Sequence, residues 1–258
     1  MIRIIAGTLL ICSLAGASPR PQGLVQVEGH GSQSNVIGGR EVVPHSYPYV
    51  VHIDAWGDCQ GFLISDEWVV TIAQCIASAD TATMTFGAHN LKEEEPEQVK
   101  MTSTEFIVYE YFHPMSFGND IALVKLPQKI QFTDAIQPAP LPTYDIKPGT
   151  TAVLTGWGQT SATDPTYSDV LREGDVTISD NDECDTYYGR RYPKTVCVMT
   201  NTGSAPFCYG DFGGALHRDG SVHGIASFFS GAGCDSGGAE VYTRIYDFVD
   251  WIKEKTGV

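Results

Sequence analysis

The sequence has few basic residues and little charge of any kind. Lys and Arg number 16 against 31 Asp and Glu, the formal net charge is −15, and charged residues make up only 18% of the chain. A protein that binds nucleic acid or an anionic membrane through charge must neutralise phosphates with Lys and Arg, so this balance argues against both partners. We interpret the acidic excess as a solubilising surface charge.

Long apolar runs are also missing after the first residues. A transmembrane helix needs roughly 20 apolar residues, and no later segment approaches that length. The chain opens with an early Arg3, an apolar run through Leu14 and small residues at Ala15 and Ala17, a pattern typical of a cleaved secretory signal. We therefore predict a signal peptide over residues 1–17 and a secreted, extracellular protein that does not bind membranes.

Cysteine is scarce, and one of the 7 cysteines lies in the predicted signal peptide. Removal of Cys12 leaves an even set of six, which predicts three disulfides in an oxidising compartment. Six cysteines allow about 15 pairings, and their spacing alone does not choose among them. The sequence has no H-E-x-x-H motif and no paired C-x-x-C motif, so it predicts no metal site and no cofactor.

Low-complexity tracts and repeats of fixed period are absent as well. Residues 18–35 are polar, contain Gly and lack periodicity, which indicates a pro-segment. From residue 36 onward, short β-rich runs such as YPYVVHI and TAVLTGW alternate with clusters of Gly, Pro, Asn and Asp, the pattern of an all-β barrel or sandwich. Only residues 245–258 have apolar residues at helical spacing, so the sequence predicts one C-terminal helix.

Six separated stretches together resemble the chymotrypsin-like serine proteases in order and spacing, from residue 36 to the C-terminus. They read NVIGGREVVPHSYPYVV, WVVTIAQCIAS, NDIALVKL, TGWGQT, CYGDFGGAL and VYTRIYDFVDWI. Within that family the chain is most similar to the brachyurin-type digestive enzymes of arthropods, through FGAHNL, SDVLRE and the run SFFSGAGCDSGGAEVYTRIYDFVDWI. The resemblance implies an all-β fold of two packed six-stranded antiparallel β-barrels over residues 36–258, with a C-terminal helix. It also implies the disulfides Cys59–Cys75, Cys184–Cys197 and Cys208–Cys234.

The catalytic triad of this family combines a hydroxyl that attacks, an imidazole that accepts a proton, and a carboxylate that orients the imidazole. By the resemblance, Gln74 stands at the histidine position and Phe212 at the nucleophile position, while Asp120 keeps the carboxylate. An amide has no useful proton affinity near neutral pH, and a benzyl group has no heteroatom. We therefore predict no catalytic residue. Asp120 is expected to accept hydrogen bonds from the Gln74 amide or from Ser227.

No other residue is placed to restore the missing chemistry. None of the 7 histidines adjoins Gln74 or Phe212; they are His30, His45, His52, His89, His113, His217 and His223. A lone histidine is more often a surface or core residue than a catalyst, so we expect no replacement base. The acidic run KEEEPEQ suggests calcium, but Ala88 stands where calcium-binding relatives have their first ligand. We interpret that run as a solvated loop.

The resemblance also assigns the specificity pocket. Its residues are Pro206 and Phe207 on one wall, Ser227, Phe228 and Phe229 on another, and Glu240 near the base. Most active relatives have Gly at the position of Phe229, so we expect its ring to narrow or close the mouth, with Phe212 crowding the same space. Such rings form either an ordinary hydrophobic cluster or an interaction surface, and the sequence leaves both open.

Other parts of the family pattern are intact. Gly210 and Asp211 belong to the loop that forms the oxyanion hole, and Asp211 stands where relatives have the carboxylate that pairs with a new N-terminal amine. Val36, at the start of V-I-G-G, could supply that amine. However, Asn35 precedes it, whereas trypsin-like activators cut after Lys or Arg. We therefore expect that the usual activation route does not apply.

Two classes of function follow from these residues. The favoured hypothesis is a secreted, monomeric, non-catalytic serine protease homologue that binds a protein or peptide partner through its altered cleft or its surface loops. The alternative is a residual or unconventional serine-type endopeptidase that relies on binding and on the backbone amides near Gly210. A third hypothesis is a storage or matrix protein.

Overall fold

The computed structural model describes residues 39–161, 164–202 and 207–258. The predicted signal peptide (1–17) and pro-segment (18–35) lie outside the described residues. All described residues belong to one compact unit, Gln33–Val258.

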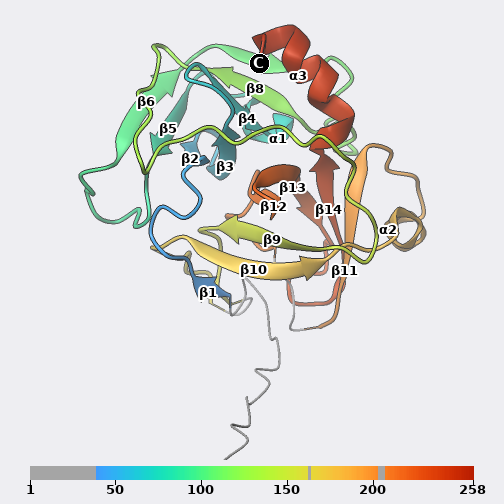
Figure 1. The fold of residues 1–258 in the computed structure, drawn as a ribbon. Helices are drawn as coiled ribbons and strands as arrows, with labels where there is room; N and C mark the ends of the chain where they lie inside the picture. The colour runs from blue at the N-terminus through green and yellow to red at the C-terminus, as the bar shows by residue number, and fades with distance from the viewer. Residues whose placement is uncertain (1–38, 162–163, 203–206) are drawn as a thin grey trace, which may run out of the picture. The chain divides into compact units, whose positions relative to one another are not determined.

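The first of two antiparallel sheets curls into a barrel (Figure 1). Its strands, in spatial order, are β6 (Val99–Ser103), β5 (Ala82–Phe86), β2 (Val50–Asp54), β3 (Asp58–Leu63), β4 (Trp68–Thr71), β8 (Ala122–Lys125) and β7 (Phe106–Val108). The two edge strands, β6 and β7, are separated in the sequence only by Thr104 and Glu105. The sheet therefore closes through one bent segment of chain.

The second sheet is built in the same way from later residues. Its strands, in spatial order, are β1 (Arg40–Glu41), β10 (Arg172–Thr177), β9 (Thr151–Gly156), β12 (Ala215–Arg218), β13 (Ser221–Phe229), β14 (Gly238–Arg244) and β11 (Thr195–Thr200). Beyond β10, the backbone N–H of Ser179 donates to the Cys197 carbonyl of β11 at 2.8 Å. This bond joins the β10 side of the sheet to β11, so the second sheet also curls round.

The predicted fold class is confirmed, although each sheet has seven strands rather than six. In the first sheet the excess arises because β6 and β7 are two halves of one bent strand. In the second sheet it arises from the two-residue strand β1, which pairs with β10 at the edge. Both differences concern the ends of strands, where a short run of hydrogen bonds decides the count.

The described residues also form four short helical segments: α1 (Ala73–Ile76), α2 (Asn181–Tyr188), the 3₁₀ helix η1 (Ile245–Phe248) and α3 (Val249–Thr256). Helix α2 begins with a capping box, in which the Asp180 carboxylate accepts from the Asp182 N–H and the Glu183 side chain accepts from the Asp180 N–H. The predicted C-terminal helix is present as η1 followed by α3. Within the described part of the chain, no helix has the length and apolar character needed to cross a membrane.

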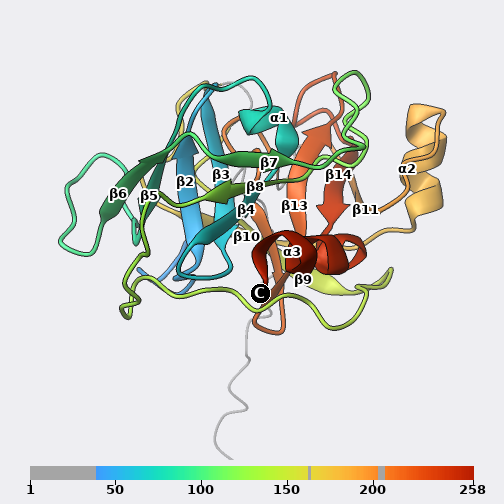
Figure 2. The ribbon, with the colours of Figure 1, turned by 90° about the horizontal axis from the view of Figure 1, so that it is seen from above.

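Two large clusters of buried apolar side chains form the core, one mainly in the first sheet and one in the second. Figure 2 shows β2 and β3 of the first sheet to the left of β13 and β14 of the second. The partly buried ring of Phe212 packs against both clusters. This residue therefore lies where the two cores meet, which places the predicted site between the barrels.

Candidate functional site

Gln74, on helix α1, is held on two sides by hydrogen bonds. Its Nε2 donates to Asp120 Oδ2 at 2.6 Å and to the Ser227 carbonyl at 2.7 Å, while its backbone N–H donates to Asp120 Oδ1 at 3.0 Å. The Ser227 hydroxyl donates to the same Asp120 Oδ2 at 2.6 Å. The prediction that Asp120 accepts from Gln74 or Ser227 is confirmed, and in fact both donate.

Asp120 is fully buried, and this burial raises the pKa of its carboxyl to about 6. The donors Ser227 and Gln74 oppose that rise because they stabilise the ionised form. The carboxylate is therefore largely ionised at neutral pH. Its partner, however, is an amide that donates hydrogen bonds and does not take up a proton.

Phe212 belongs to a cluster of phenylalanine rings in the second barrel. Its ring centroid lies 5.3 Å from that of Phe207, in an edge-to-face arrangement, and 5.8 Å from that of Phe229, in a stacked one. The Phe207 and Phe229 centroids are 5.0 Å apart. The structure thus joins three residues that the sequence assigned to one cleft, and it arranges them as a hydrophobic cluster.

The space that would form the specificity pocket is closed. The part lined by Phe229, Cys234 and Glu240 has no room for a water molecule among the described residues. Glu240 is buried, and its carboxylate accepts from the Phe207 N–H at 3.3 Å and from the Tyr242 hydroxyl at 2.8 Å. Burial raises the pKa of Glu240 to about 8.

The other assigned pocket residues have different surroundings. The ring of Phe228 packs against those of Phe117, Tyr188 and Tyr192 instead of facing an open pocket. Pro206 lies outside the described residues.

The side chain of Asp211 is buried, and its carboxyl group lies so close to the neighbouring backbone that the residues there must be glycine. Its Oδ1 accepts from the Gly158 N–H at 2.8 Å and its Oδ2 from the Cys208 N–H at 3.1 Å, and burial raises its pKa to about 7. A Cβ at Gly158 would lie 2.4 Å from the carboxyl group of Asp211. Val36, the proposed partner of Asp211, lies outside the described residues, so their pairing stays a prediction.

The loop at Gly210 is fixed by a residue that the sequence analysis did not select. Gln60, buried in β3, donates from Nε2 to the Gly210 carbonyl at 2.8 Å. Among the described residues, the backbone N–H groups of Gly210 and Phe212 have no acceptor. The only sequence signal for this role is a polar residue inside the otherwise largely apolar run C-Q-G-F-L of β3.

The three predicted cysteine pairs are present as disulfides: Cys59–Cys75, Cys184–Cys197 and Cys208–Cys234. The first of them ties β3 to helix α1, and so holds Gln74 beside the strand that carries Gln60. The third closes the segment from Cys208 to Cys234, which contains Phe212 and all of β13.

The acidic loop after residue 88 is organised by one of its own carboxylates. Glu95 accepts from the N–H groups of His89 at 2.7 Å and Asn90 at 3.0 Å, and from Gln98 Nε2 at 3.0 Å. In residues 39–161, 164–202 and 207–258, no group of His, Cys, Asp or Glu side chains has an arrangement that could hold a metal ion.

The described histidines lie in other environments. His217 is buried between the Tyr49 hydroxyl and the Thr155 hydroxyl, and burial lowers its pKa to about 3. His52 pairs with Asp58, Nε2 to Oδ1, at 3.2 Å. No histidine in the described part of the chain is hydrogen-bonded to Gln74 or Asp120.

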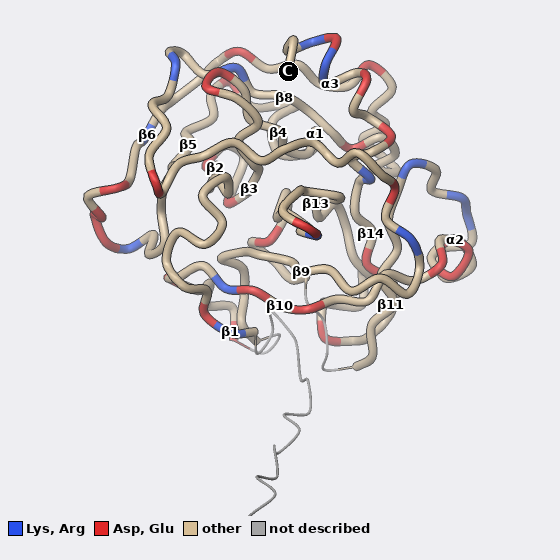
Figure 3. Tube along the Cα trace, viewed as in Figure 1, with Lys and Arg blue, Asp and Glu red and all other residues tan. Residues whose placement is uncertain are grey.

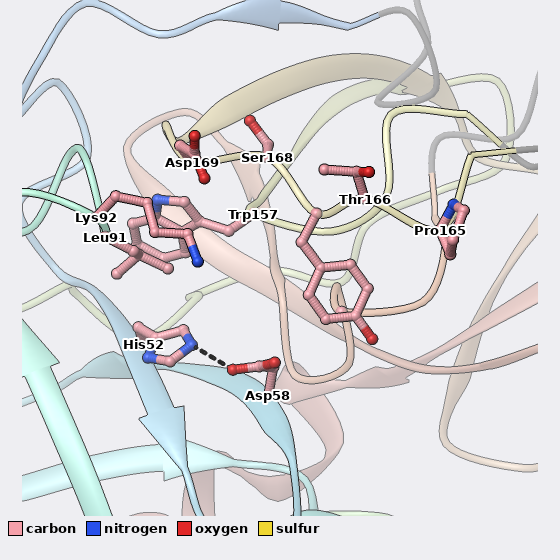
Figure 4. A pocket seen from close by; sticks show the side chains of 11 residues that line it. His52, Asp58, Leu91, Lys92, Trp157, Pro165, Thr166, Ser168 and Asp169 are labelled. Carbon is pink, nitrogen blue, oxygen red and sulfur yellow. Dashed lines mark hydrogen bonds and ion pairs between the residues drawn. The ribbon is translucent and has the colours of Figure 1, made fainter.

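On the other side of Phe212 the surface is open. A hollow of about 300 Å³ is lined by Gln74, Phe212, Gly210, the Cys59–Cys75 disulfide, Trp56, Gly57, Asp58, Tyr167 and Tyr209. A second hollow of about 390 Å³ shares Asp58, Tyr167 and Gly210 with the first and continues to His52, Leu91, Lys92, Trp157 and residues 165–169 (Figure 4). Together they form a cleft beside Gln74 and Phe212, the two predicted triad positions.

Comparisons with known proteins agree with this geometry. The protein-family model described as Trypsin matches residues 36–252. The chain is 40% identical over 225 residues to brachyurin of Leptuca pugilator, covering 86% of this chain and 99% of that protein. It is 35% identical over 228 residues to chymotrypsin of Phaedon cochleariae, covering 84% and 81%.

A solved structure described as HL collagenase gives a TM-score of 0.76 at 31% identity, covering 85% of this chain and 98% of that one. The matched length, the two curled sheets and the disulfide pairing all lead to the same assignment. The chain therefore belongs to the trypsin-like family of serine proteases.

Proposed function

We propose that this protein is a non-catalytic member of the family and that it binds a protein or peptide partner. The observation that carries the proposal is the hydrogen-bonded set of Gln74, Asp120 and Ser227, next to the ring of Phe212. Acyl transfer by this family needs an imidazole to take a proton from an attacking hydroxyl. At these positions there is an amide, whose donor atom is already engaged twice, and a ring with no atom that attacks.

The closed pocket supports the same proposal. A substrate side chain that enters between Phe229 and Glu240 would have to displace a packed aromatic ring and a buried carboxylate. Separating such a cluster loses both buried apolar area and aromatic contacts. A partner is therefore bound on the open side of the cleft or through loops.

Secretion is part of the proposal. Three disulfides are characteristic of proteins that mature in oxidising compartments. Expression in secreting cells, followed by N-terminal sequencing of the released protein, tests the predicted cleavage after Ala17. Protein retained inside the cell with an intact leader would contradict it.

The experiment that tests the loss of catalysis uses protein whose N-terminus has been cut to Val36. It is incubated with a fluorophosphonate probe and with a mixed peptide library, and brachyurin of Leptuca pugilator serves as the active control. We expect no labelled serine and no cleaved peptide. A covalent label on any serine of this chain would overturn the proposal.

Residual hydrolysis is the second candidate, favoured by the N–H groups of Gly210 and Phe212, which have no acceptor among the described residues. Such donors can stabilise a developing oxyanion, and loss of triad members in related enzymes leaves about 10³–10⁴-fold acceleration over water. Hydrolysis of an activated ester by the folded protein, with the reduced and unfolded chain as control, measures it. Equal rates for the two would exclude this candidate.

A further inference from the structure

Three exposed aromatic side chains surround the open hollow of about 300 Å³. Trp56 is 74% exposed, Tyr209 47% and Tyr167 40%. Single exposed aromatic residues are common on protein surfaces, but several around one concave site are a feature of recognition surfaces. These three rings come from three separate segments: the β2–β3 turn, the loop before β10 and the loop before β12.

The three rings are held in place although they are exposed. Trp56 Nε1 donates to the Ser78 carbonyl at 2.9 Å. The ring of Tyr209 contacts Phe229 edge to face at 5.1 Å. Tyr167 pairs through its backbone with Gln159, and its ring carbons would lie 3.4 Å from a Cβ at Gly210. Such fixed rings bind a ligand without first losing conformational entropy.

Asp58 is the only charged residue that lines this hollow within the described part of the chain. Its side chain is 49% exposed, and Oδ1 accepts from His52 Nε2 at 3.2 Å. The second oxygen, Oδ2, accepts no hydrogen bond from the described residues and is therefore available to a ligand. Figure 4 shows the pair with its bond, with Thr166, Ser168 and Asp169 across the adjoining hollow.

We infer that this hollow binds the guanidinium group of an arginine side chain in the partner protein or peptide, an inference that rests on the proposed function. Aromatic faces attract cations, and a planar guanidinium can stack on a ring while its N–H groups donate to a carboxylate. Trp56, Tyr167 and Tyr209 supply the faces, and Asp58 supplies the carboxylate. An acidic ligand side chain would meet Asp58 as a like charge.

The surrounding charge supports a basic partner. The chain carries a net charge of −15, and Asp and Glu are spread over both sheets and their loops (Figure 3). A protein with this balance attracts cationic ligands over distances up to the screening length. In the adjoining hollow, Lys92 is accompanied by Asp169 and by Asp58, which lines both hollows. In the first hollow Asp58 is the one charged side chain among the described lining residues, so no cationic side chain there competes with the ligand.

The test compares two probes on the wild-type protein: acetyl-Gly-Arg-Gly-amide and the same tripeptide with citrulline, which has the shape of arginine without its charge. Binding is followed by tryptophan fluorescence, because Trp56 is exposed at the site. We expect the arginine probe to bind with a dissociation constant about 10-fold or more below that of the citrulline probe. Equal binding of the two, or no binding of either, would overturn the inference.

Two variants locate the site. Asp58→Asn keeps the shape and the acceptor for His52, and it should remove most of the preference for arginine over citrulline. Asp134→Asn, at an exposed acid on another loop, is the matched control and should keep that preference in full. If Asp134→Asn loses the preference as much as Asp58→Asn does, the effect comes from overall charge, and the inference is wrong.

The same experiment separates the two proposals. Hydrolysis of either probe by the wild-type protein would overturn the proposed function as well. Without hydrolysis, equal binding of the probes overturns only the assignment of the hollow to arginine.

Discussion

On one side of Phe212, toward Phe229 and Glu240, the space between the described residues has no room for a water molecule. On the other side, hollows of about 300 and 390 Å³ lie next to Gln74 and Asp58. The closed side is lined by phenylalanine rings that contact one another, whereas on the open side Trp56, Tyr167 and Tyr209 are exposed and each is fixed by a different contact. The difference shows that side chains alone can close half of a cleft while the backbone fold stays intact.

The largest effect is expected from variants that restore the catalytic side chains and also reopen the closed side of the cleft. The double variant Gln74→His and Phe212→Ser should remain inactive or very weak on peptides, because Phe229 still fills the pocket mouth. Adding Phe229→Gly should raise peptide cleavage by about 10³-fold or more over the wild-type protein, since a complete triad contributes about 10⁶-fold. All variants are assayed with casein after cutting to Val36.

If the double variant digests casein as well as the triple variant does, Phe229 is no barrier and the closed side does not decide binding. If neither works after correct processing, positions beyond these three have also changed.

The next largest effect concerns stability on the closed side. Phe207 is fully buried among aromatic rings, so Phe207→Ala should lower the free energy of unfolding by about 3–5 kcal/mol. Tyr209→Ala, two residues along and largely exposed, is the matched control and should cost much less. Urea unfolding followed by fluorescence measures both. Equal losses for the two variants would mean that the Phe207 site is not a packed core.

Stability should also depend on pH through Glu240. Its folded-state pKa of about 8 lies above the ordinary value of 4.5, so the folded protein holds this proton more tightly than the unfolded chain. The resulting stabilisation is complete below pH 4.5 and is lost as the pH rises through 8. The free energy of unfolding of the wild-type protein should thus fall from pH 5 to pH 8. Glu240 should account for at least about 1 kcal/mol of that fall.

The check is Glu240→Gln, which cannot titrate and should therefore show a flatter fall between pH 5 and pH 8. Asp211 and Asp120, whose pKa values are also raised by burial, keep part of the slope in this variant. An unchanged slope would show that Glu240 is not buried as described.

The smallest effect on stability is expected on the open side. Trp56→Ala removes an exposed ring, so it should change the free energy of unfolding by less than about 0.5 kcal/mol. The same variant should weaken binding of the arginine tripeptide. A loss of stability comparable to that of Phe207→Ala would mean that the two sides of the cleft do not differ in the way proposed.

Much of the fold could be predicted from the sequence because the information is local or comes with the family resemblance. β-rich runs bounded by Gly, Pro, Asn and Asp, such as those that form β2 and β9, and the helical spacing from Ile245 predicted these elements. The cysteine pairing came only from the resemblance. The hydrogen bonds to Asp120 could be anticipated because a buried carboxylate needs donors and two were already assigned to the same site.

The rest depends on contacts between distant segments. Nothing near Gln60 in the sequence indicates that its side chain binds the Gly210 carbonyl, 150 residues later. The exposed rings of Trp56, Tyr167 and Tyr209 were not selected either, since each looks ordinary in its own loop. The strand count differed because β1 and the break between β6 and β7 depend on a few backbone bonds.

The position of Phe212 between the two cores has a consequence for the history of this chain. By the proposed function, Phe212→Ser alone would remove a ring that packs against both cores and would gain no activity while Gln74 remains. Gln74→His alone would place an imidazole beside a residue that cannot attack. If the proposed function is correct, neither substitution alone restores catalysis, and two simultaneous changes are needed before either gives an advantage.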